Sequence, residues 1–211
     1  MKVYFIRHGE SEGNRQGIIQ GWKDFPLSGL GKKQAQLVGQ AVSALQFDRI
    51  YSSDLSRAYE TALAIGEHQK AEIIKWDKIR EITLGPLEGK PKKEILETYP
   101  EVQERGLLTS GVAGTETVEA ITKRCQEIEK ELFAKHQEGE SVLLVCHGGL
   151  ISIFLMYVLL GESWHQYHRP FVIGNTSVTM VEWKKGQQPM IHFINQTTHL
   201  QANDTIYQAI K

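Results

Sequence analysis

The sequence predicts an α/β protein, a three-layer α/β/α sandwich around a mostly parallel central sheet. Two observations predict this class. Short apolar runs with strand character alternate along the chain with longer segments whose apolar residues recur at helical spacing. Polar turns that contain glycine follow several of the short runs. Strands that alternate with helices favour parallel pairing, and such sheets bind ligands at the carboxyl ends of their strands.

Each expected element has a local signal. Strands are expected where β-rich or alternating runs occur, at residues 2–6, 49–52, 73–79, 141–146, 177–183 and 190–195. Helices are expected where the apolar spacing is helical, at residues 30–45, 55–67, 116–136 and 150–160. Ser53 or Asp54 is positioned to cap the helix over 55–67.

The chain of 211 residues is long enough for one substantial domain, and no repeat, low-complexity tract or linker divides it. We therefore expect a single domain over residues 1–211. Residues 90–115 mix a lysine-rich start, a short helical pattern and a stretch rich in Gly, Ser and Thr. Such a segment suits an insertion or lid over a site.

Composition narrows the partners and the compartment. Lysine and arginine number 24 against 25 acidic residues, so the formal net charge of −1 argues for neither nucleic acid nor membrane as a partner. The apolar run 150–160 is shorter than the roughly 20 residues that cross a bilayer, and the apolar N-terminus is too short for a secretory signal. Two cysteines cannot build a disulfide framework. A cytoplasmic protein is expected.

The residues after the first strand suit phosphoryl transfer. A neutral imidazole attacks phosphorus without a helper base because its pKa is ordinarily about 6.5, so His8 is a candidate nucleophile. Arg7 offers a forked, permanently charged donor for phosphate oxygens, and Arg57 is a second such donor on a helix. Gly9 allows close approach of the backbone.

These residues belong to a longer pattern that resembles the histidine phosphatase superfamily, which includes the cofactor-dependent phosphoglycerate mutases and their phosphatase relatives. Matching blocks follow one another in the family's order from residue 2 to about 183. They are Arg7-His8-Gly9-Glu10-Ser11 with Asn14, Gly21-Trp22-x-Asp24-x-Pro26-Leu27-Ser28, Tyr51-Ser52-Ser53-Asp54-Leu55-x-Arg57-Ala58-x-Glu60-Thr61-Ala62, Arg80-Glu81-Ile82-x-x-Gly85-x-x-Glu88-Gly89, Val145-Cys146-His147-Gly148-Gly149 and Asn175-Thr176-Ser177-Val178-Thr179.

The resemblance implies a phosphoglycerate mutase-like fold and a set of site residues. His8 is implied as the residue phosphorylated in the intermediate, and His147 as a cationic donor. The residues implied to surround the phosphoryl group are Arg7, Asn14, Gln20, Arg57, His147 and the amide of Gly148. Asn14 and Gln20 are expected to add neutral donors.

The resemblance also implies that Glu81 protonates the leaving oxygen and then activates the water that attacks phosphohistidine. A carboxyl group beside a bound phosphate dianion in a closed pocket is expected to keep a proton near neutrality. Glu88 and Glu10 are the rival carboxyl groups. The spacing relative to the glycines at 85 and 89 favours Glu81.

No metal and no cofactor are expected, since two arginines and a protonated histidine neutralise a phosphate. His165 and His168 lack an accompanying cysteine or carboxylate cluster, which argues against a metal pair. Cys146 has Ser152 where a cysteine phosphatase needs arginine, so core packing is its expected role. The expected partners are a small phosphorylated metabolite and inorganic phosphate as product.

Three functions remain open. The leading interpretation is a phosphoric monoester hydrolase. The alternative is a cofactor-dependent phosphoglycerate mutase, but mutases of this family have a tyrosine three places after the acid and an arginine pair in the insertion, where this chain has Leu84 and a single Arg105. An inactive phosphate-ligand sensor or interaction module on the same fold is the third. The substrate alcohol and the oligomeric state are not set by the sequence.

Overall fold

The computed structural model describes residues 1–167 and 169–201, and these form an α/β/α sandwich. Its central sheet has six strands in the order β4-β3-β6-β1-β7-β8. The strands are β1 (Lys2–Arg7), β3 (Arg49–Ser52), β4 (Ile73–Lys75), β6 (Ser141–Cys146), β7 (Val178–Glu182) and β8 (Met190–Gln196). The predicted fold class is confirmed.

The sheet is parallel on one side and antiparallel on the other. Strands β4, β3, β6 and β1 are parallel, whereas β7 pairs antiparallel with both β1 and β8. The connection between β7 and β8, residues 183–189, is too short for a crossover helix, so the two strands form a hairpin. Periodicity located these two strands but could not give their direction.

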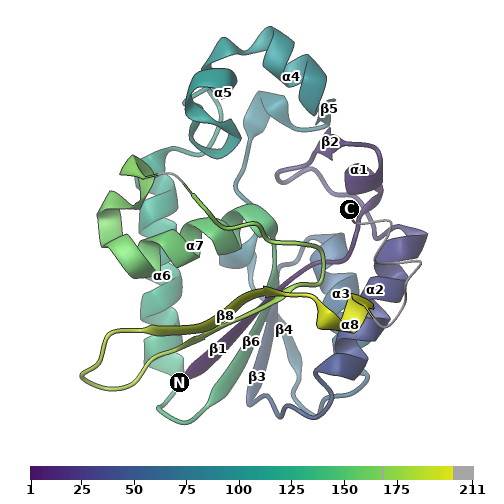
Figure 1. Ribbon diagram of the computed structural model, residues 1–211, viewed down its shortest axis with the longest axis vertical. Coiled ribbons are helices and arrows are strands. Elements are labelled where there is room, and N and C mark those ends of the chain that lie inside the picture. The colour runs from purple at the N-terminus through teal and green to yellow at the C-terminus, as the bar shows by residue number, and fades with distance from the viewer. Residues whose placement is uncertain (168, 202–211) are drawn as a thin grey trace.

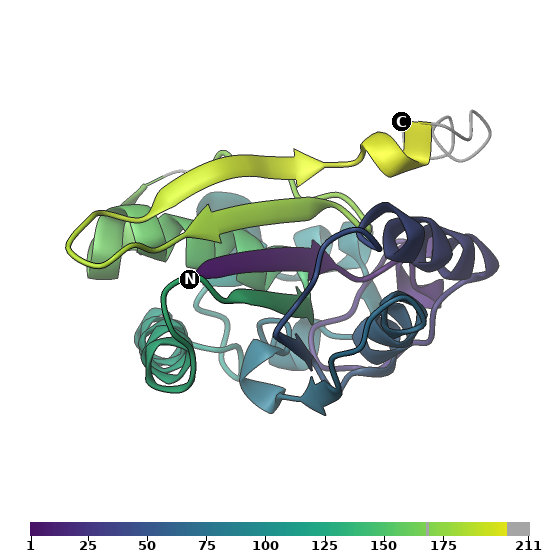
Figure 2. The same cartoon turned by 90° about the horizontal axis from the view of Figure 1, so that it is seen from below.

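Helices cover both faces of the sheet. In Figure 1, α6 (Val118–Lys135) and α7 (Gly148–Leu160) lie to the left of the strands, and α2 (Gly29–Ala41) and α3 (Ser56–Gly66) lie to the right. Figure 2 shows the same layers from below. Each face therefore has its own core.

The residues of β1 alternate between these two cores. Val3 and Phe5 pack with the apolar stripe of α6 and with α7, whereas Tyr4 and Ile6 pack with α2 and α3. All four side chains are buried. A strand buried on both faces reads as a continuous apolar run, which is the pattern at the start of this sequence.

The segment predicted as an insertion or lid folds into short helices and turns that lie outside the central sheet. Residues 90–115 contain β5 (Lys90–Pro91), α4 (Lys92–Thr98), α5 (Pro100–Arg105) and a 3-10 turn η3 (Leu107–Thr109). They lie at the top of Figure 1, beyond the carboxyl ends of the parallel strands. β5 pairs with β2 (Ile18–Ile19). The remaining short elements are α1 (Glu12–Arg15), η1 (Asp77–Ile79), η2 (Gly85–Leu87), η4 (Gly161–Gln166) and α8 (Thr198–Gln201).

Two local predictions are wrong. The strand expected over 73–79 ends at Lys75, which pairs with Ser52, the last residue of β3, and the chain then turns into η1. The helix α3 is capped by neither Ser53 nor Asp54; the Ser53 hydroxyl accepts from the amide of Leu55, the residue before the helix. The first amide of α3, that of Ser56, donates instead to both carboxylate oxygens of Asp24, at 3.0 and 3.2 Å.

Within residues 1–167 and 169–201, every helix is too short or too polar to pass through a bilayer.

Candidate active site

The carboxyl ends of β1, β3 and β6 meet at one edge of the sheet, and the predicted site residues gather there. A cavity of about 250 Å³ at this edge brings six of them together: Arg7, His8, Asn14, Gln20, Arg57 and Glu81. Leu84, Leu107 and Leu108 supply apolar walls. His147 and Gly148, at the start of α7, lie directly beside this cavity. All eight predicted residues are therefore neighbours.

His8 is held so that one ring nitrogen stays free. The side chain is 2% exposed, and its Nδ1 lies 2.6 Å from the carbonyl oxygen of Gly9. A carbonyl oxygen only accepts, so Nδ1 carries the proton and Nε2 keeps its lone pair. Burial, and then the charges of Arg57 and Arg7, hold the pKa of His8 well below its usual value. His8 is a neutral imidazole with a free Nε2, the form that attacks phosphorus.

The glycine beside it allows the close approach of backbone that the sequence predicted, here toward another segment of the chain. A Cβ on Gly9 would lie 2.5 Å from the carbonyl oxygen of Gly31, at the start of α2. The Gly9 amide donates to the Thr61 hydroxyl at 3.0 Å. Gly9 thus permits the loop after β1 to pack closely on two helices. This packing holds His8 in position.

Two arginines provide fixed positive charge. Arg57 is 1% exposed, and its Nη2 donates to the carbonyl oxygen of Gly21 at 2.8 Å. Arg7 donates from Nη1 to the carbonyl oxygen of Ile173 at 2.6 Å. The Nε atoms of Arg7 and Arg57 are shielded from solvent and have no hydrogen-bond partner among the described residues. Buried donors without acceptors suit an oxyanion, which would supply the missing acceptors.

Asn14 and Gln20 are oriented through their oxygens by one serine. The backbone amide of Ser11 donates to Oδ1 of Asn14 at 3.1 Å, and the Ser11 hydroxyl donates to Oε1 of Gln20 at 2.7 Å. Since their acceptor oxygens are occupied, the amide NH₂ groups are the ends left for an anion. This geometry supports their prediction as neutral donors.

His147 is buried, and its surroundings favour the neutral ring. Burial, and then the charge of Arg57, hold its pKa well below the usual value. Its Nε2 lies 2.9 Å from the Ser53 hydroxyl, and its Nδ1 is buried without a hydrogen-bond partner among the described residues. The cationic donor that the sequence analysis expected in a site that holds phosphate remains a prediction.

The carboxylate of Glu81 lies at the N-terminus of α7. Its two oxygens accept from the amides of Gly149 and Leu150 at 3.0 and 2.9 Å. A Cβ on Gly149 would lie 2.5 Å from Oε1 of Glu81, and a Cβ on Gly148 would lie 3.2 Å from Nε of Arg7. The two glycines therefore let both charged groups pack against the helix end. The sequence analysis expected the Gly148 amide to contribute and missed those of Gly149 and Leu150.

The rival carboxyl groups are engaged elsewhere. Glu88 accepts from the amides of Trp22, Lys23 and Leu84 at 3.0, 3.0 and 2.8 Å. It thereby holds the loop after α1 against the loop after β4. Glu10 accepts from the Ser28 hydroxyl at 2.6 Å, at the start of α2. Neither of them lines the cavity that contains His8.

A polar clamp orders the loop that carries Glu81. Asp54 pairs with both Nε and Nη2 of Arg80, and the guanidinium of Arg80 lies 4.8 Å from the ring centre of Trp22. Trp22 in turn donates from Nε1 to the carbonyl oxygen of Glu81 at 2.7 Å. Asp54, which the sequence analysis offered as a helix cap, positions the loop of the candidate acid instead.

The turn before β7 supports the backbone of His8. Asn175 donates from its side-chain amide to the carbonyl oxygen of His8 at 3.0 Å, and the amide of Thr176 donates to the carbonyl oxygen of Arg7 at 3.0 Å. Thr176 has φ of 53°, a left-handed conformation that costs free energy in a residue other than glycine. The two residues position His8 from the neighbouring strand.

A second cavity of about 320 Å³ adjoins the first and shares Arg7, Glu81, Leu108 and Gly149 with it. Its other walls come from α7 and from the segment before β7, and they include Arg169. The sequence analysis did not single out Arg169, since a lone arginine in an irregular segment carries no motif.

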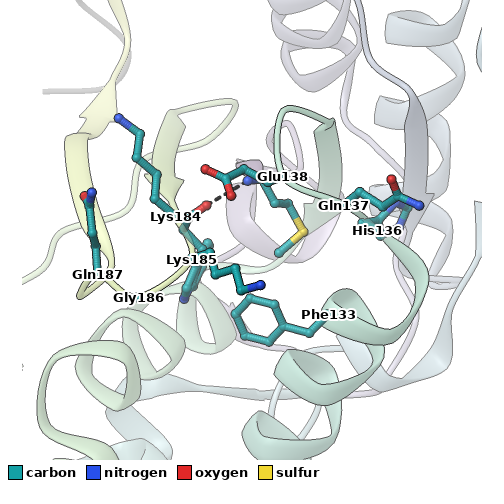
Figure 3. Close-up of a pocket in the computed structure, with 10 residues that line it drawn as sticks. Phe133, His136, Gln137, Glu138, Lys184, Lys185, Gly186 and Gln187 are labelled. Atoms are coloured by element: carbon teal, nitrogen blue, oxygen red, sulfur yellow. Dashed lines mark hydrogen bonds between the residues drawn. The ribbon is translucent and has the colours of Figure 1, made fainter.

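A larger cavity, of about 430 Å³, lies at the opposite edge of the sheet. Figure 3 shows the ring of Phe133, from α6, beside Lys185 of the β7–β8 connection, whereas His136 lies farther from that connection. His136 is engaged, with Nδ1 2.8 Å from Glu140 and Nε2 3.1 Å from the Tyr51 hydroxyl. This cavity lies at the amino ends of the parallel strands, away from all of the predicted site residues.

Among residues 1–167 and 169–201, no three His, Cys, Asp or Glu side chains are grouped as metal ligands. His168 lies outside the described residues. The expectation of a metal-free and cofactor-free site remains a prediction.

Comparison with known proteins identifies the family. A model of the histidine phosphatase superfamily (branch 1) matches residues 3–197. The chain belongs to this superfamily. Histidine phosphatase relatives include phosphoserine phosphatase 1 of Hydrogenobacter thermophilus, 34% identical over 95% of this chain and 94% of that protein. A broad-specificity phosphatase of Saccharomyces cerevisiae, YOR283W, is 30% identical over 95% of this chain and 87% of that protein.

Relatives named as mutases and solved structures also match. A probable phosphoglycerate mutase GpmB of Salmonella choleraesuis is 29% identical over 89% of this chain and 87% of that protein. The structure of YhfR from Bacillus stearothermophilus superposes with a TM-score of 0.83 at 28% identity, over 94% of this chain and 98% of the other. A phosphoserine phosphatase mutant from Entamoeba histolytica, in complex with phosphoserine, superposes with a TM-score of 0.76 at 28% identity, over 94% and 98%.

Proposed function

We propose that this histidine phosphatase superfamily member is a phosphatase that hydrolyses small phosphomonoesters through a phosphohistidine intermediate on His8. One observation carries the proposal. The neutral His8 ring donates from Nδ1 to Gly9, which leaves the Nε2 lone pair in a cavity that also contains Arg7 and Arg57. A nucleophile and charged donors for the non-bridging oxygens are the two parts that phosphoryl transfer needs first.

In the first step, Nε2 of His8 forms a bond to phosphorus while the bond from phosphorus to the ester oxygen breaks. The phosphorylated ring carries positive charge, which the Gly9 carbonyl oxygen stabilises through the Nδ1 proton. The leaving oxygen takes a proton from Glu81. The amides of Gly149 and Leu150 hold the Glu81 carboxyl group at the start of α7, beside the His8 cavity.

In the second step, water gives a proton to Glu81 and its oxygen attacks phosphorus. The bond between phosphorus and nitrogen breaks, its electron pair returns to Nε2, and inorganic phosphate is released. In both steps, the non-bridging oxygens are proposed to bind to Arg7, Arg57, Asn14, Gln20 and His147. No step requires a metal or a cofactor.

Hydrolysis is favoured over mutase activity by the walls of the site. Leu84, which stands where mutases of the family have tyrosine, is an apolar wall of the His8 cavity. Arg105 lines neither that cavity nor the adjoining one. Among the described residues, the site thus lacks the tyrosine and the arginine pair that mutases of the family have. The similarity to proteins named as phosphoserine and broad-specificity phosphatases supports the same choice.

The wider setting is proposed as well. We take residues 1–211 as a single domain in which residues 90–115 form a lid, supported by the position of Leu107 and Leu108 in the cavity wall. A cytoplasmic location is supported by Cys125 and Cys146, both buried and not joined in a disulfide. Small phosphorylated metabolites are the proposed partners, rather than nucleic acids or membranes.

The test compares two fates of the phosphoryl group. The purified chain is incubated with 3-phosphoglycerate, with and without a catalytic amount of 2,3-bisphosphoglycerate, and both inorganic phosphate and 2-phosphoglycerate are measured. We expect phosphate release that does not need the bisphosphate. Formation of 2-phosphoglycerate faster than phosphate would establish the mutase alternative, and neither product from any phosphomonoester would favour the inactive sensor.

A further inference from the structure

The cavity that adjoins the His8 cavity has a composition of its own. Its walls include Ser152 from α7, and Arg169, Phe171 and Ile173 from the segment before β7. The boundary between the two cavities contains Glu81 and Arg7. Glu81 is the group proposed to protonate the leaving oxygen. The leaving alcohol would therefore lie next to this second cavity.

Among the described residues, Arg169 is the one cation that lines the second cavity but not the phosphate site. Its Nη1 atom is shielded from solvent and has no hydrogen-bond partner among the described residues. Burial lowers the pKa of its guanidinium, and the negative charge of Glu81 acts in the opposite direction. A guanidinium stays charged through such shifts, so Arg169 brings an unsatisfied positive charge and free N–H donors to the cavity.

The two cavities differ in how much negative charge they are built to bind. Two arginines, two side-chain amides and a histidine surround the proposed phosphate site. Among the described residues, the polar side chains that line the second cavity but not the first are Arg169 and Ser152, within apolar walls from Leu108, Phe171 and Ile173. One forked guanidinium matches the two oxygens of a carboxylate and balances its single charge, whereas it would leave the second charge of a phosphate dianion unbalanced.

We propose that Arg169 is a specificity residue that binds the carboxylate of a substrate whose leaving group is a short hydroxy acid. This inference rests on the proposed phosphatase function, since it assigns the second cavity to the leaving alcohol. Ser152 assists by hydrogen bonding. The apolar walls around Arg169 exclude water, which strengthens the ion pair relative to one at the surface.

The test uses two substrates that differ only at the carboxylate. 3-Phosphoglycerate carries it, and glycerol 3-phosphate has a hydroxymethyl group in its place. We expect Arg169→Gln to raise KM for 3-phosphoglycerate by roughly 10- to 100-fold, the range of a lost charged hydrogen bond, and to leave KM for glycerol 3-phosphate within about threefold. The kcat for p-nitrophenyl phosphate should not change. Arg169→Lys should restore part of the loss.

Arg105→Gln is the matched control, because Arg105 is an arginine of the neighbouring 90–115 segment that lines neither cavity. It should affect neither substrate. Equal losses on both substrates after Arg169→Gln, or no loss on either, would overturn the assignment. A selective loss on 2,3-bisphosphoglycerate instead of 3-phosphoglycerate would assign Arg169 to a second phosphate and overturn the carboxylate.

A binding measurement separates this inference from the phosphatase proposal. In a His8→Ala background, which cannot form phosphohistidine, calorimetry measures the affinity for the same two ligands. We expect 3-phosphoglycerate to bind roughly 10-fold or more tightly than glycerol 3-phosphate, and Arg169→Gln to remove that preference. No preference, or one that survives Arg169→Gln, contradicts the inference. Such a result would leave hydrolysis and phosphohistidine formation intact, whereas their failure alone would not affect the preference.

Discussion

The phosphate pocket and the segment 90–115 lie against each other but are stabilised differently. In the pocket, His8, Arg57 and His147 are almost fully buried, and each is fixed by a bond to backbone or to a neighbouring hydroxyl. In the helices of the segment, only Ile95 and Val102 are buried, and no side chain caps either helix. This difference supports the proposed division of recognition, in which the pocket binds the phosphoryl group and its more exposed surroundings bind the alcohol.

The largest effect on kcat is expected for a substitution at Glu81, the candidate acid. Glu81→Gln should lower kcat by about 10²- to 10⁴-fold, the range for loss of a general acid and base, and weaken binding of inorganic phosphate far less. Glu97→Gln, on α4 of the 90–115 segment, is the matched control and should leave both unchanged. The measurements are steady-state kinetics and phosphate inhibition. Comparable losses in kcat and phosphate affinity would count against Glu81 as the acid.

A substitution at Arg57 tests how much the fixed positive charge of the pocket contributes to catalysis. Arg57→Gln should lower kcat/KM by about 10²- to 10³-fold on every phosphomonoester, as expected for loss of one fixed donor to a developing charge. Arg105→Gln, in the adjoining segment, should stay within about threefold of the wild type. A panel of phosphomonoesters checks that the Arg57 effect is uniform. An effect confined to one alcohol would move Arg57 from the phosphate pocket to substrate selection.

A substitution at Gly149, which packs against Glu81, should lower kcat by an intermediate amount. The Cβ of Gly149→Ala would lie 2.5 Å from Oε1 of Glu81, so the carboxylate must move from the start of α7. We expect kcat to fall about tenfold, because an error of position on the order of 1 Å is costly at a reacting centre. Gly29→Ala is the control, since no atom lies within 4 Å of its Cβ. Unchanged kcat in Gly149→Ala would show that the packing of Glu81 is not needed.

The features that sequence predicted best are those that local chemistry determines. The continuous apolar run before Arg7 predicted a buried strand. The residue types and spacing around His8 predicted where the site lies. Glu81, which the sequence analysis chose over Glu88 and Glu10 by its spacing to the glycines, lines the cavity, and its role as the acid remains a prediction. Long-range pairings were not predictable. Asp24 caps α3 from another loop, and Gly9 packs against α2, contacts between residues far apart in the chain.

Arg169 shows the same limit at the site itself. It lies more than 160 residues from Arg7 in sequence, in a segment with no regular structure, and reaches the cavity only because that segment precedes β7 at the edge of β1. The pKa of His147 also depends on burial, which no sequence pattern reports. The fold and the residues that line the His8 cavity were thus accessible from sequence, whereas the pKa shifts of the buried histidines and the residues of the second cavity were not.

The smallest expected effect concerns stability and pH. Burial lowers the folded-state pKa of His8 and His147, and lowers that of His199 to about 4. Unfolded histidines bind protons below about pH 6.5, so the unfolded state takes up more protons and stability falls as pH decreases from there toward the folded-state pKa. Each histidine contributes at most about 1.4 kcal/mol per pH unit. Above pH 7 this dependence should disappear.

Urea unfolding between pH 5 and pH 8 measures this slope. The slope should be smaller in His147→Gln, which removes one of the buried histidines, and unchanged in His68→Gln, whose side chain is exposed. Inorganic phosphate should offset part of the loss, because a dianion in the pocket favours protonated histidine and binds only the folded state. A stability that rises on acidification below pH 6.5 would contradict the neutral, buried state of these histidines.

The most direct test of the central claim is capture of the phosphorylated enzyme. The chain is mixed with a ³²P-labelled phosphomonoester, quenched in alkali within one turnover, and digested for identification of the labelled peptide. The account predicts alkali-stable, acid-labile label on the peptide that contains His8, and none in His8→Ala. Hydrolysis at the wild-type rate without label at His8, or equal labelling of His8→Ala, would contradict it.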